Sequence, residues 1–278
     1  MRGLGLVAVL LQVGRVMAWL APLNPPIRDW QGKRVWVVGA SSGIGAALAR
    51  ALAARGARLG LSARSRSGLE AVALDCGIDT VLAAMDVTRP EDFARARDTL
   101  LAHWGGIDLL VLCAGTYRPL RAWELESTLI RETLDTNVFG AMVGAAAVIP
   151  HLMQRGQGAI ALVGSVAGYG GLPKASVYGP SKAALINFAE TLHLDLSPKG
   201  LGVYLIDPGF VLTPLTARND FHMPALISAE EAAQEIIAGF ARGDFEIHFP
   251  RRFTRVLKLL QWLPRRWYFP LIRRLTGL

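Results

Sequence analysis

Tyr178 and Lys182 have the types and the spacing to carry out acid–base chemistry. They begin and end the segment Tyr-Gly-Pro-Ser-Lys, which precedes an alanine-rich run typical of a helix. Residues four apart lie on the same face of a helix, so the phenol and the ammonium would address one small volume. Because a neighbouring cation favours the phenolate, we expect Lys182 to lower the pKa of Tyr178 from its usual value of about 10. The pair predicts a proton donor and acceptor near neutral pH.

A glycine-rich turn lies far upstream of this pair. Gly39, Gly43 and Gly45 fall between an apolar run at 34–38 and a helical run at 46–55. The first glycine permits a tight turn, the second lets the backbone approach a pyrophosphate, and the third lets helix and strand pack closely. The N–H groups and the positive dipole end of the helix would then face the phosphates. The pattern predicts a dinucleotide site, with an ordinary glycine-rich loop as the alternative.

The end of the next apolar run indicates which dinucleotide is preferred. In a dinucleotide-binding fold, an Asp or Glu at this point would bond the ribose 2′-hydroxyl. The run at 57–62 is instead followed by Arg64, Ser65 and Arg66. A guanidinium pairs well with a phosphate, so Arg64 favours NADP(H), with NAD(H) still possible. The alternative is that Arg64 is a solvated loop charge.

Apolar runs alternate with helical runs from residue 31 to residue 250. The expected strands lie at 34–38, 57–62, 80–85, 107–113, 158–163, 201–206 and 245–249. This alternation predicts an α/β fold: a three-layer, doubly wound parallel sheet (Rossmann fold) in a single domain. Ligands of such sheets lie at the carboxyl ends of the strands. Ser165 and the Pro208-Gly209 turn both follow expected strands, and Tyr178 comes soon after one.

Taken together, these motifs resemble those of the short-chain dehydrogenase/reductase (SDR) family over about residues 31–250. The resemblance rests on their order and spacing, in Gly39-x-x-x-Gly43-x-Gly45, Asp86, Ala114-Gly115, Asn137, Ser165, Tyr178-x-x-x-Lys182 and Pro208-Gly209. Two positions depart from the family's pattern. Val38 stands where the family commonly has Thr, and Leu112-Cys113 stand where it commonly has Asn-Asn. These departures concern the support of the loop and the adenine end.

The resemblance implies a role for each residue of a catalytic set. Tyr178 would exchange a proton with the substrate oxygen, and Ser165 would hydrogen-bond the same oxygen. Lys182 would lower the pKa of Tyr178 and hold the nicotinamide ribose. Asn137 would hold a water that links Lys182 to solvent. The implied cofactor contacts are Gly39, Ser41, Ser42, Gly43, Ile44, Gly45, Arg64, Asp86, Val87, Ala114, Gly115, Asn137, Tyr178, Lys182, Pro208, Gly209, Val211 and Thr213.

The net charge of +8 comes from one end of the chain. Residues 251–278 hold eight of the 30 Lys and Arg residues and no Asp or Glu, and the remaining 22 basic residues balance the 22 acidic ones. Apolar residues recur at helical spacing in this tail, with tryptophans beside the arginines. Such a basic amphipathic extension is typical of helices on anionic membranes. A helix packed on the protein's own substrate cleft or on a partner subunit is the alternative, and nucleic-acid binding is less favoured.

Residues 1–30 form an apolar N-terminal extension. Its apolar run at 3–14 is too short to span a bilayer. A weak membrane anchor, an extra helix on the domain and a mis-assigned start, with translation from Met17, are all open. The two cysteines and the five scattered histidines show no metal-ligand spacing, so no metal site is expected.

These observations predict an NAD(P)H-dependent oxidoreductase that interconverts a carbonyl and a secondary alcohol. The basic tail and an apolar loop at 210–227 favour reduction of a hydrophobic, lipid-like substrate. We expect a cytoplasmic protein, peripheral on the cytoplasmic face of the membrane, and by analogy with the family a homodimer or homotetramer. The alternative is a non-catalytic NADP(H)-binding sensor or membrane scaffold.

Overall fold

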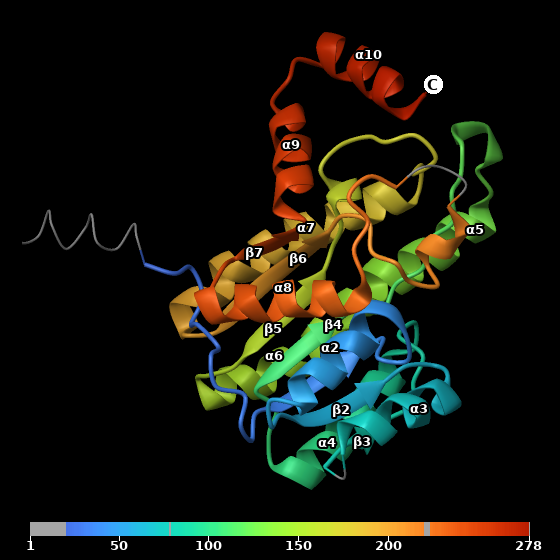
Figure 1. The fold of residues 1–278 in the computed structure, drawn as a ribbon. Helices are drawn as coiled ribbons and strands as arrows, with labels where there is room; N and C mark the ends of the chain where they lie inside the picture. Colours follow the sequence, from blue (N-terminus) through green and yellow to red (C-terminus); the bar gives the residue numbers. More distant parts are fainter. Residues whose placement is uncertain (1–20, 78, 220–222, 278) are drawn as a thin grey trace, which may run out of the picture.

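The computed structural model describes residues 21–77, 79–219 and 223–277 of the chain. Within these residues, seven parallel strands form one sheet in the order β3-β2-β1-β4-β5-β6-β7 (Figure 1). The strands are β1 (Arg34–Val38), β2 (Arg58–Ser62), β3 (Val81–Leu82), β4 (Leu109–Leu112), β5 (Ala159–Val163), β6 (Gly202–Pro208) and β7 (Glu246–Phe249). The predicted doubly wound parallel sheet is confirmed.

Burial on both faces explains why the central strands are continuous apolar runs. Every residue of β4 and of β5 is buried, as expected for strands covered by helices on both sides. At the edge, β3 is shorter than the expected strand at 80–85. Backbone bonds from Ala83 to Leu61 and from Met85 to Ala63 continue the pairing beyond it.

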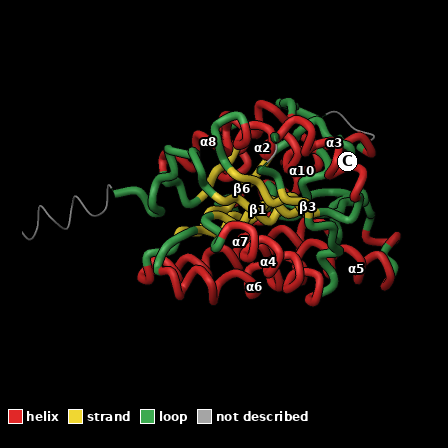
Figure 2. Tube along the Cα trace, turned by 90° about the horizontal axis from the view of Figure 1, so that it is seen from below, coloured by secondary structure: helices red, strands yellow, loops and turns green. Residues whose placement is uncertain are grey.

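Helices cover both faces of the sheet (Figure 2). One face carries α2 (Gly43–Ala53), α3 (Arg66–Cys76) and α8 (Ala229–Arg242), and the other carries α4 (Pro90–Trp104), α6 (Gly140–Arg155) and α7 (Tyr178–Leu196). Each layer has its own apolar core, because a sheet buried on both faces separates two sets of side chains. The result is a three-layer domain.

The helix expected at 125–153 is interrupted by a π-turn. It consists of α5 (Ser127–Leu134), the π-turn η2 (Asp135–Phe139) and α6. The whole stretch Ser127–Arg155 is long and apolar enough to cross a bilayer. Here its inner face packs against the sheet, with Ala145, Val148 and Leu152 fully buried. Its apolar composition therefore serves the core of the domain.

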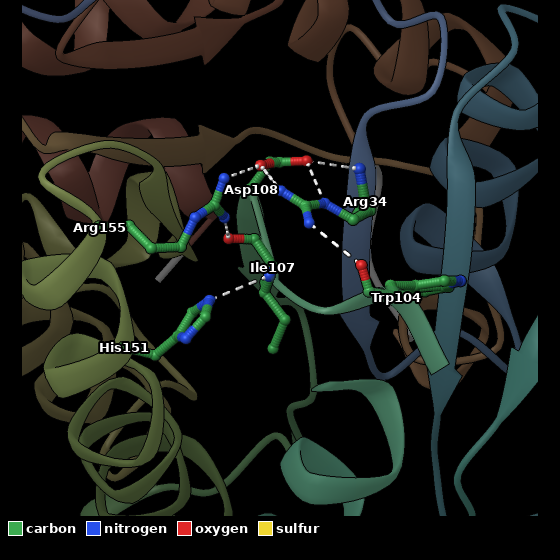
Figure 3. A network of polar contacts seen from close by, with 6 residues as sticks. All are labelled: Arg34, Trp104, Ile107, Asp108, His151 and Arg155. Carbon is green, nitrogen blue, oxygen red and sulfur yellow. Dashed lines mark hydrogen bonds and ion pairs between the residues drawn. The ribbon is translucent and has the colours of Figure 1, made fainter. Parts of the chain in front are cut away.

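The two ends of the sheet carry different groups. The strands all run parallel, but the strand order reverses between β1 and β4, so the loops after them lead to opposite faces of the sheet and leave room for a ligand. At the opposite, amino-terminal end, Asp108 lies between Arg34 and Arg155 in a network of polar contacts (Figure 3). This network joins β1, the start of β4 and the end of α6.

The two extensions both contact the domain. In the described part of the N-terminal one, the buried Asn24 side chain bonds the backbone N–H and C=O of Val203 at 2.8 and 2.7 Å. The possible anchor or alternative start at 1–20 lies outside the described residues.

The C-terminal extension forms α9 (Arg251–Gln261) and α10 (Arg265–Thr276), drawn in red in Figure 1. Its inner side is buried at Thr254, Tyr268 and Ile272. The tail thus packs on the protein along one side.

Candidate active site

The loops at the carboxyl ends of the strands surround one cleft of about 510 Å³. Ser165, directly after β5, lines it together with Tyr178 and Lys182 from the first turn of α7. The predicted cofactor residues that also line it are Gly39, Ser41, Ser42, Gly43, Ile44, Arg64, Val87, Ala114, Gly115, Pro208, Gly209, Val211 and Thr213. The residues predicted to transfer the proton and the turn predicted to bind phosphate therefore share one cavity.

Tyr178 and Lys182 lie close together, but burial changes their pKa values against our expectation. Lys182 Nζ lies 5.6 Å from the centre of the Tyr178 ring. Burial raises the pKa of Tyr178 to about 12, although a hydrogen bond with Ser165 lowers it. Burial also lowers the pKa of Lys182 to about 8. The prediction of a Tyr178 pKa below its usual value is wrong for the protein alone, because burial disfavours the charged form of each group.

Further contacts hold these three side chains in place. Lys182 Nζ donates to the carbonyl oxygen of Val163, at the end of β5, over 2.8 Å. Ser165 Oγ accepts from the backbone N–H of Ala167 at 3.1 Å. The ring of Tyr117 packs edge-on against Tyr178, with 4.9 Å between ring centres. The phenol is thus fixed between an aromatic ring, a hydroxyl and an ammonium group.

Asn137 has a different place from the other predicted catalytic residues. It lies in the π-turn η2, is fully buried and does not line the cleft. Its amide oxygen accepts from Thr116 N–H at 2.7 Å, and its amide nitrogen donates to Thr116 C=O and to Ser181 Oγ, both at 3.0 Å. Asn137 therefore joins the loop after β4 to the residue next to Lys182. A π-turn at a functional site is a recurring device for placing one side chain.

The glycine turn has the shape that a diphosphate requires. Gly39 has φ +90°, and a Cβ there would lie 2.6 Å from the backbone nitrogen of Ala114. A Cβ on Gly45 would lie 2.3 Å from the carbonyl oxygen of Gly39, so this position also excludes a side chain. The side chain of Ser42, the N-cap residue of α2, makes no capping bond. Gly43 and Ile44, the first two residues of α2, line the cleft, so their N–H groups would face a ligand there, which fits a dinucleotide.

Arg64 lies where the predicted ribose contact falls, just beyond the end of β2. Arg64 makes no salt bridge within the described residues, whereas its neighbour Arg66 pairs with Glu70 at 3.0 Å. Asp86 does not line the cleft. Burial raises the pKa of Asp86, but hydrogen bonds from Thr88 and the nearby Arg64 outweigh this and lower it. Arg64 therefore lines the cleft without a salt-bridge partner among the described residues, although it is near enough to Asp86 to lower the pKa of that carboxyl group.

Several residues at the site were missed by sequence reasoning. Thr116 and Tyr117 directly follow Ala114-Gly115, a motif that signals the position but not their contacts. Cys113 lines the cleft, and burial raises the pKa of its thiol to about 11. Asp207 is fully buried directly before Pro208-Gly209. The sequence signal for Asp207 is its position directly after the apolar run Gly-Val-Tyr-Leu-Ile.

A comparison with protein families agrees with this geometry. The family model described as short chain dehydrogenase matches residues 33–223. The chain belongs to the short-chain dehydrogenase family. The match covers Gly39, Gly43, Ser165, Tyr178 and Lys182, which are among the residues that line the cleft.

This short-chain dehydrogenase has curated relatives of similar length. It is 37% identical over 242 residues to an uncharacterized oxidoreductase of Myxococcus xanthus, covering 86% of this chain and 96% of the relative. It is 36% identical over 239 residues to 11-beta-hydroxysteroid dehydrogenase-like 4A of Arabidopsis thaliana, covering 81% and 79%. It is 33% identical over 180 residues to 3-oxoacyl-[acyl-carrier-protein] reductase of Bos taurus, covering 65% and 76%.

Solved structures share the fold of this short-chain dehydrogenase. One is a short-chain dehydrogenase/reductase from Burkholderia phymatum in complex with NAD, with a TM-score of 0.78, 23% identity, and coverage of 84% of this chain and 94% of that one. Another, from Streptomyces avermitilis, has a TM-score of 0.73 and 22% identity, covering 82% and 92%. At these identities the likeness establishes the fold.

Proposed function

We propose that this short-chain dehydrogenase is an NADPH-dependent reductase that converts the carbonyl of an apolar, lipid-like substrate into a secondary alcohol. The observation that carries the proposal is the shared cleft. Tyr178, Ser165 and Lys182 line the same cavity as the glycine turn and Arg64. A carbonyl group in that cavity would lie beside a phenol, a hydroxyl and an ammonium group, and next to the cofactor's binding turn.

The residues present fit a nicotinamide dinucleotide. The glycine turn and the N-terminus of α2 would hold its diphosphate, Lys182 its nicotinamide ribose, and the segment from Pro208 to Thr213 its carboxamide end. When bound, this cofactor supplies the hydride. The protein supplies position, exclusion of water and control of the proton.

Tyr178 is the proton donor of the proposed reduction. With a pKa of about 12, its phenol keeps its proton at neutral pH. Ser165 Oγ would hydrogen-bond the same substrate oxygen as charge develops there. Lys182, whose pKa is about 8, still carries its positive charge at neutral pH and favours the phenolate that remains after transfer. Asn137 supports this chain of groups through Ser181, the residue before Lys182.

The preference for NADPH rests on the charge at the end of β2. Arg64 and Ser65 line the cleft there, and no Asp or Glu of the described residues lines it with them. A guanidinium would pair with a 2′-phosphate, whereas a carboxylate would repel one. NADH has no 2′-phosphate, so Arg64 would have no phosphate to pair with when NADH is bound.

The lipid-like substrate is supported by the outer side of the tail. Leu259 and Trp262 are 70% and 86% exposed, and Trp267, Phe269 and Leu275 are also exposed. Exposed aromatic and aliphatic side chains among arginines are typical of helices on anionic lipid surfaces. The inner side contacts the cleft's own loops, because Phe253 packs on Phe210 with 5.8 Å between ring centres. A membrane-bound tail would therefore hold the cleft near a lipid surface.

Product analysis with a membrane lipid extract and NADPH tests the proposed reaction. We expect NADPH consumption together with a new secondary alcohol derived from an apolar carbonyl compound. The matched control is the same extract with Tyr178→Phe protein, which retains the ring but not the proton. NADPH binding without reduction of any compound in the extract or in a broad carbonyl panel would favour the sensor interpretation instead.

Flotation with vesicles tests the membrane contact separately. The double variant Leu259→Ser/Trp262→Ser changes only outward side chains, so the domain should keep its thermal stability. We expect weaker flotation with phosphatidylserine vesicles than for the wild type. Leu194→Ser, at an exposed position of α7, is the control. Equal flotation of both variants and the wild type would remove the tail from the proposal.

A further inference from the structure

The Ser165 turn, which comprises residues 165–172, begins with a small hydrogen-bonded unit. Ser165 Oγ accepts from the backbone N–H of Ala167 at 3.1 Å, and the carbonyl oxygen of Ser165 accepts from Gly168 N–H at 2.9 Å. The N–H of Tyr169 then donates to the carbonyl oxygen of the residue three before it at 3.1 Å. The side chain of Ser165 is therefore tied to the backbone that follows it.

This unit lies directly against the first turn of α7. A Cβ on Gly168 would lie 2.8 Å from backbone atoms of Lys182 and of Ala183. From the side of the helix, a Cβ on Gly179 would lie 3.2 Å from the carbonyl oxygen of Ala167. The turn and the helix that carries the phenol and the ammonium group are thus in close backbone contact. A shift of the turn would change the position of the serine relative to the phenol.

The far end of the turn is held by the C-terminal tail. Gly170 and Gly171 have no side chains with which to hold this end, and glycine restricts the backbone less than any other residue. The hydroxyl of Tyr268, on α10, donates to the carbonyl oxygen of Gly171 at 3.0 Å. A Cβ on Gly170 would lie 2.7 Å from the same hydroxyl oxygen. Because Tyr268 is only 3% exposed, a buried phenol of the tail supplies the contact that the glycines lack.

A second contact from the tail reaches the middle of the turn. Lys258 of α9 pairs with one oxygen of Glu246, at the start of β7. The hydroxyl of Tyr169 donates to the other oxygen of Glu246 at 2.5 Å. Lys258 Nζ also lies 5.6 Å from the centre of the Tyr169 ring, within the range of a cation–π contact. Tyr169 is therefore held between the sheet and the tail.

The tail itself is fixed where it leaves the sheet. In Figure 1, α9 leads away from the end of β7. Thr254, which is fully buried, donates its hydroxyl to the carbonyl oxygen of Pro250 at 3.1 Å and lies 2.6 Å from His248 Nδ1. A Cβ on Gly209 would lie 3.1 Å from the ring of Phe253. The tail thus has a fixed origin, from which α9 and α10 reach the Ser165 turn.

We propose that the C-terminal tail is a clamp that positions Ser165 against Tyr178. Tyr268 holds the glycine end of the turn and Lys258 holds Tyr169, so the turn is fixed beyond the serine as well as at the end of β5. Neither tail residue lines the cleft, so both are positioning residues that act through the turn. The inference rests on the proposed role of Ser165, but not on the NADPH preference, the substrate class or the membrane contact.

Hydrogen exchange of the full chain, followed by mass spectrometry, tests the clamp. In Tyr268→Phe, which keeps the ring but loses the hydrogen bond to Gly171, amides of the Ser165 turn should exchange about fivefold faster, as expected for the loss of one ordinary hydrogen bond. Tyr204→Phe is the matched control. The hydroxyl of Tyr204 also donates to a backbone carbonyl, that of Pro25 at 2.6 Å, and Tyr204 does not line the cleft. Exchange of the turn should be unchanged in the control.

Carbon-13 labelling of the tyrosine ring carbon that bears the hydroxyl reports on the phenol of Tyr178. Its resonance should shift in Tyr268→Phe and in Lys258→Met, because its hydrogen-bond partner Ser165 moves with the turn. Lys258→Arg keeps a positive charge at this position and should restore the resonance towards its wild-type value. Leu259→Ser, at the exposed position next to Lys258, is the control and should cause no shift.

Two results would overturn the clamp. One is unchanged exchange of the turn in Tyr268→Phe, or an equal increase in Tyr204→Phe. The other is an unchanged Tyr178 resonance in Tyr268→Phe or Lys258→Met, because the turn would then move without the site. Neither measurement uses a substrate or a cofactor. A failure of the clamp therefore leaves the proposed reduction standing, and a failure to find a reduced product leaves these measurements valid.

Discussion

At the amino-terminal end of the sheet, Asp108 accepts hydrogen bonds from Arg34 and Arg155 at 2.6 to 3.0 Å. At the carboxyl end, Lys182 donates to the carbonyl oxygen of Val163, and neither oxygen of Asp207 has a hydrogen-bond partner within the described residues. Burial alone would raise the pKa of Asp108, but bonds from the two arginines hold it well below its ordinary value. At the carboxyl end burial prevails and shifts both groups toward their neutral forms.

This difference separates a charge that is satisfied within the fold from groups whose burial disfavours their charge. The partners of Asp108 satisfy its charge, so the network (Figure 3) joins three elements at a net gain in stability. Lys182, which lines the cleft, keeps hydrogen-bonding capacity for a ligand there, and the protein bears the cost of burying it. Shifted pKa values in a cleft are characteristic of functional sites. Substitutions of single residues at each end test this difference.

The largest effect is expected from Tyr178→Phe. Loss of a general acid lowers kcat by about 100- to 10,000-fold. The thermal midpoint and the affinity for NADPH should change little, because the ring remains and the phosphate turn is separate. Single-turnover kinetics and fluorescence titration with NADPH measure the two quantities. Substantial residual turnover would remove Tyr178 as the proton donor.

At the other end, Asp108→Asn should reduce stability and leave the cofactor site intact. Breaking a partly buried ion pair leaves two arginines without their partner, which we expect to cost about 2 kcal/mol near neutral pH. The pKa of Asp108 is lowered in the folded state, so its contribution is present above the unfolded pKa and is lost as pH falls through the lower folded value. Urea unfolding at several pH values should show the wild type and the variant converging in acid.

A smaller change is expected from Arg64→Ala. A lost charge-assisted bond to a 2′-phosphate should weaken NADPH binding about tenfold, with little effect on NADH. Arg66→Ala is the control, since that guanidinium is already paired with Glu70. Isothermal titration with both cofactors measures the difference. Equal losses in the two variants would argue against a specific role for Arg64.

The smallest expected effect is a gain in stability from Lys182→Met. The lowered pKa of Lys182 means that burying its charge costs free energy, and an apolar side chain of similar length avoids that cost. We expect about 1 kcal/mol of added stability, measured by urea unfolding, together with loss of turnover. A destabilised variant would mean that the ammonium group is better satisfied than its contacts indicate.

Much of the cleft could be predicted from local sequence. The glycine turn, the strands and the Tyr178–Lys182 pair are encoded by spacing, since periodicity and backbone freedom act over a few residues. The pKa of Tyr178 could not be predicted in this way. It depends on burial by Tyr117 and the surrounding loops, which come from other parts of the chain.

The C-terminal tail was also predictable only in part from local sequence. Its amphipathic pattern predicted helical structure over 251–278, and α9 and α10 are helical. The sequence left open whether its apolar residues pack on the protein or contact a membrane. One side of the tail packs on the protein, and the other side is exposed. The pattern could not reveal which residues lie on which side, nor that Lys258 reaches Glu246.

The sequence by itself determined the doubly wound fold, the family and many of the residues that line the cleft, because each depends on short-range pattern and order along the chain. Only the tertiary structure decided which charges are satisfied. Asp108 and Asp207 are both aspartates beside parallel strands, and local sequence gives no reason to separate them. The arginines around one, and the carboxylate and apolar surroundings of the other, are brought there by contacts between distant segments, and those contacts determine the protonation state.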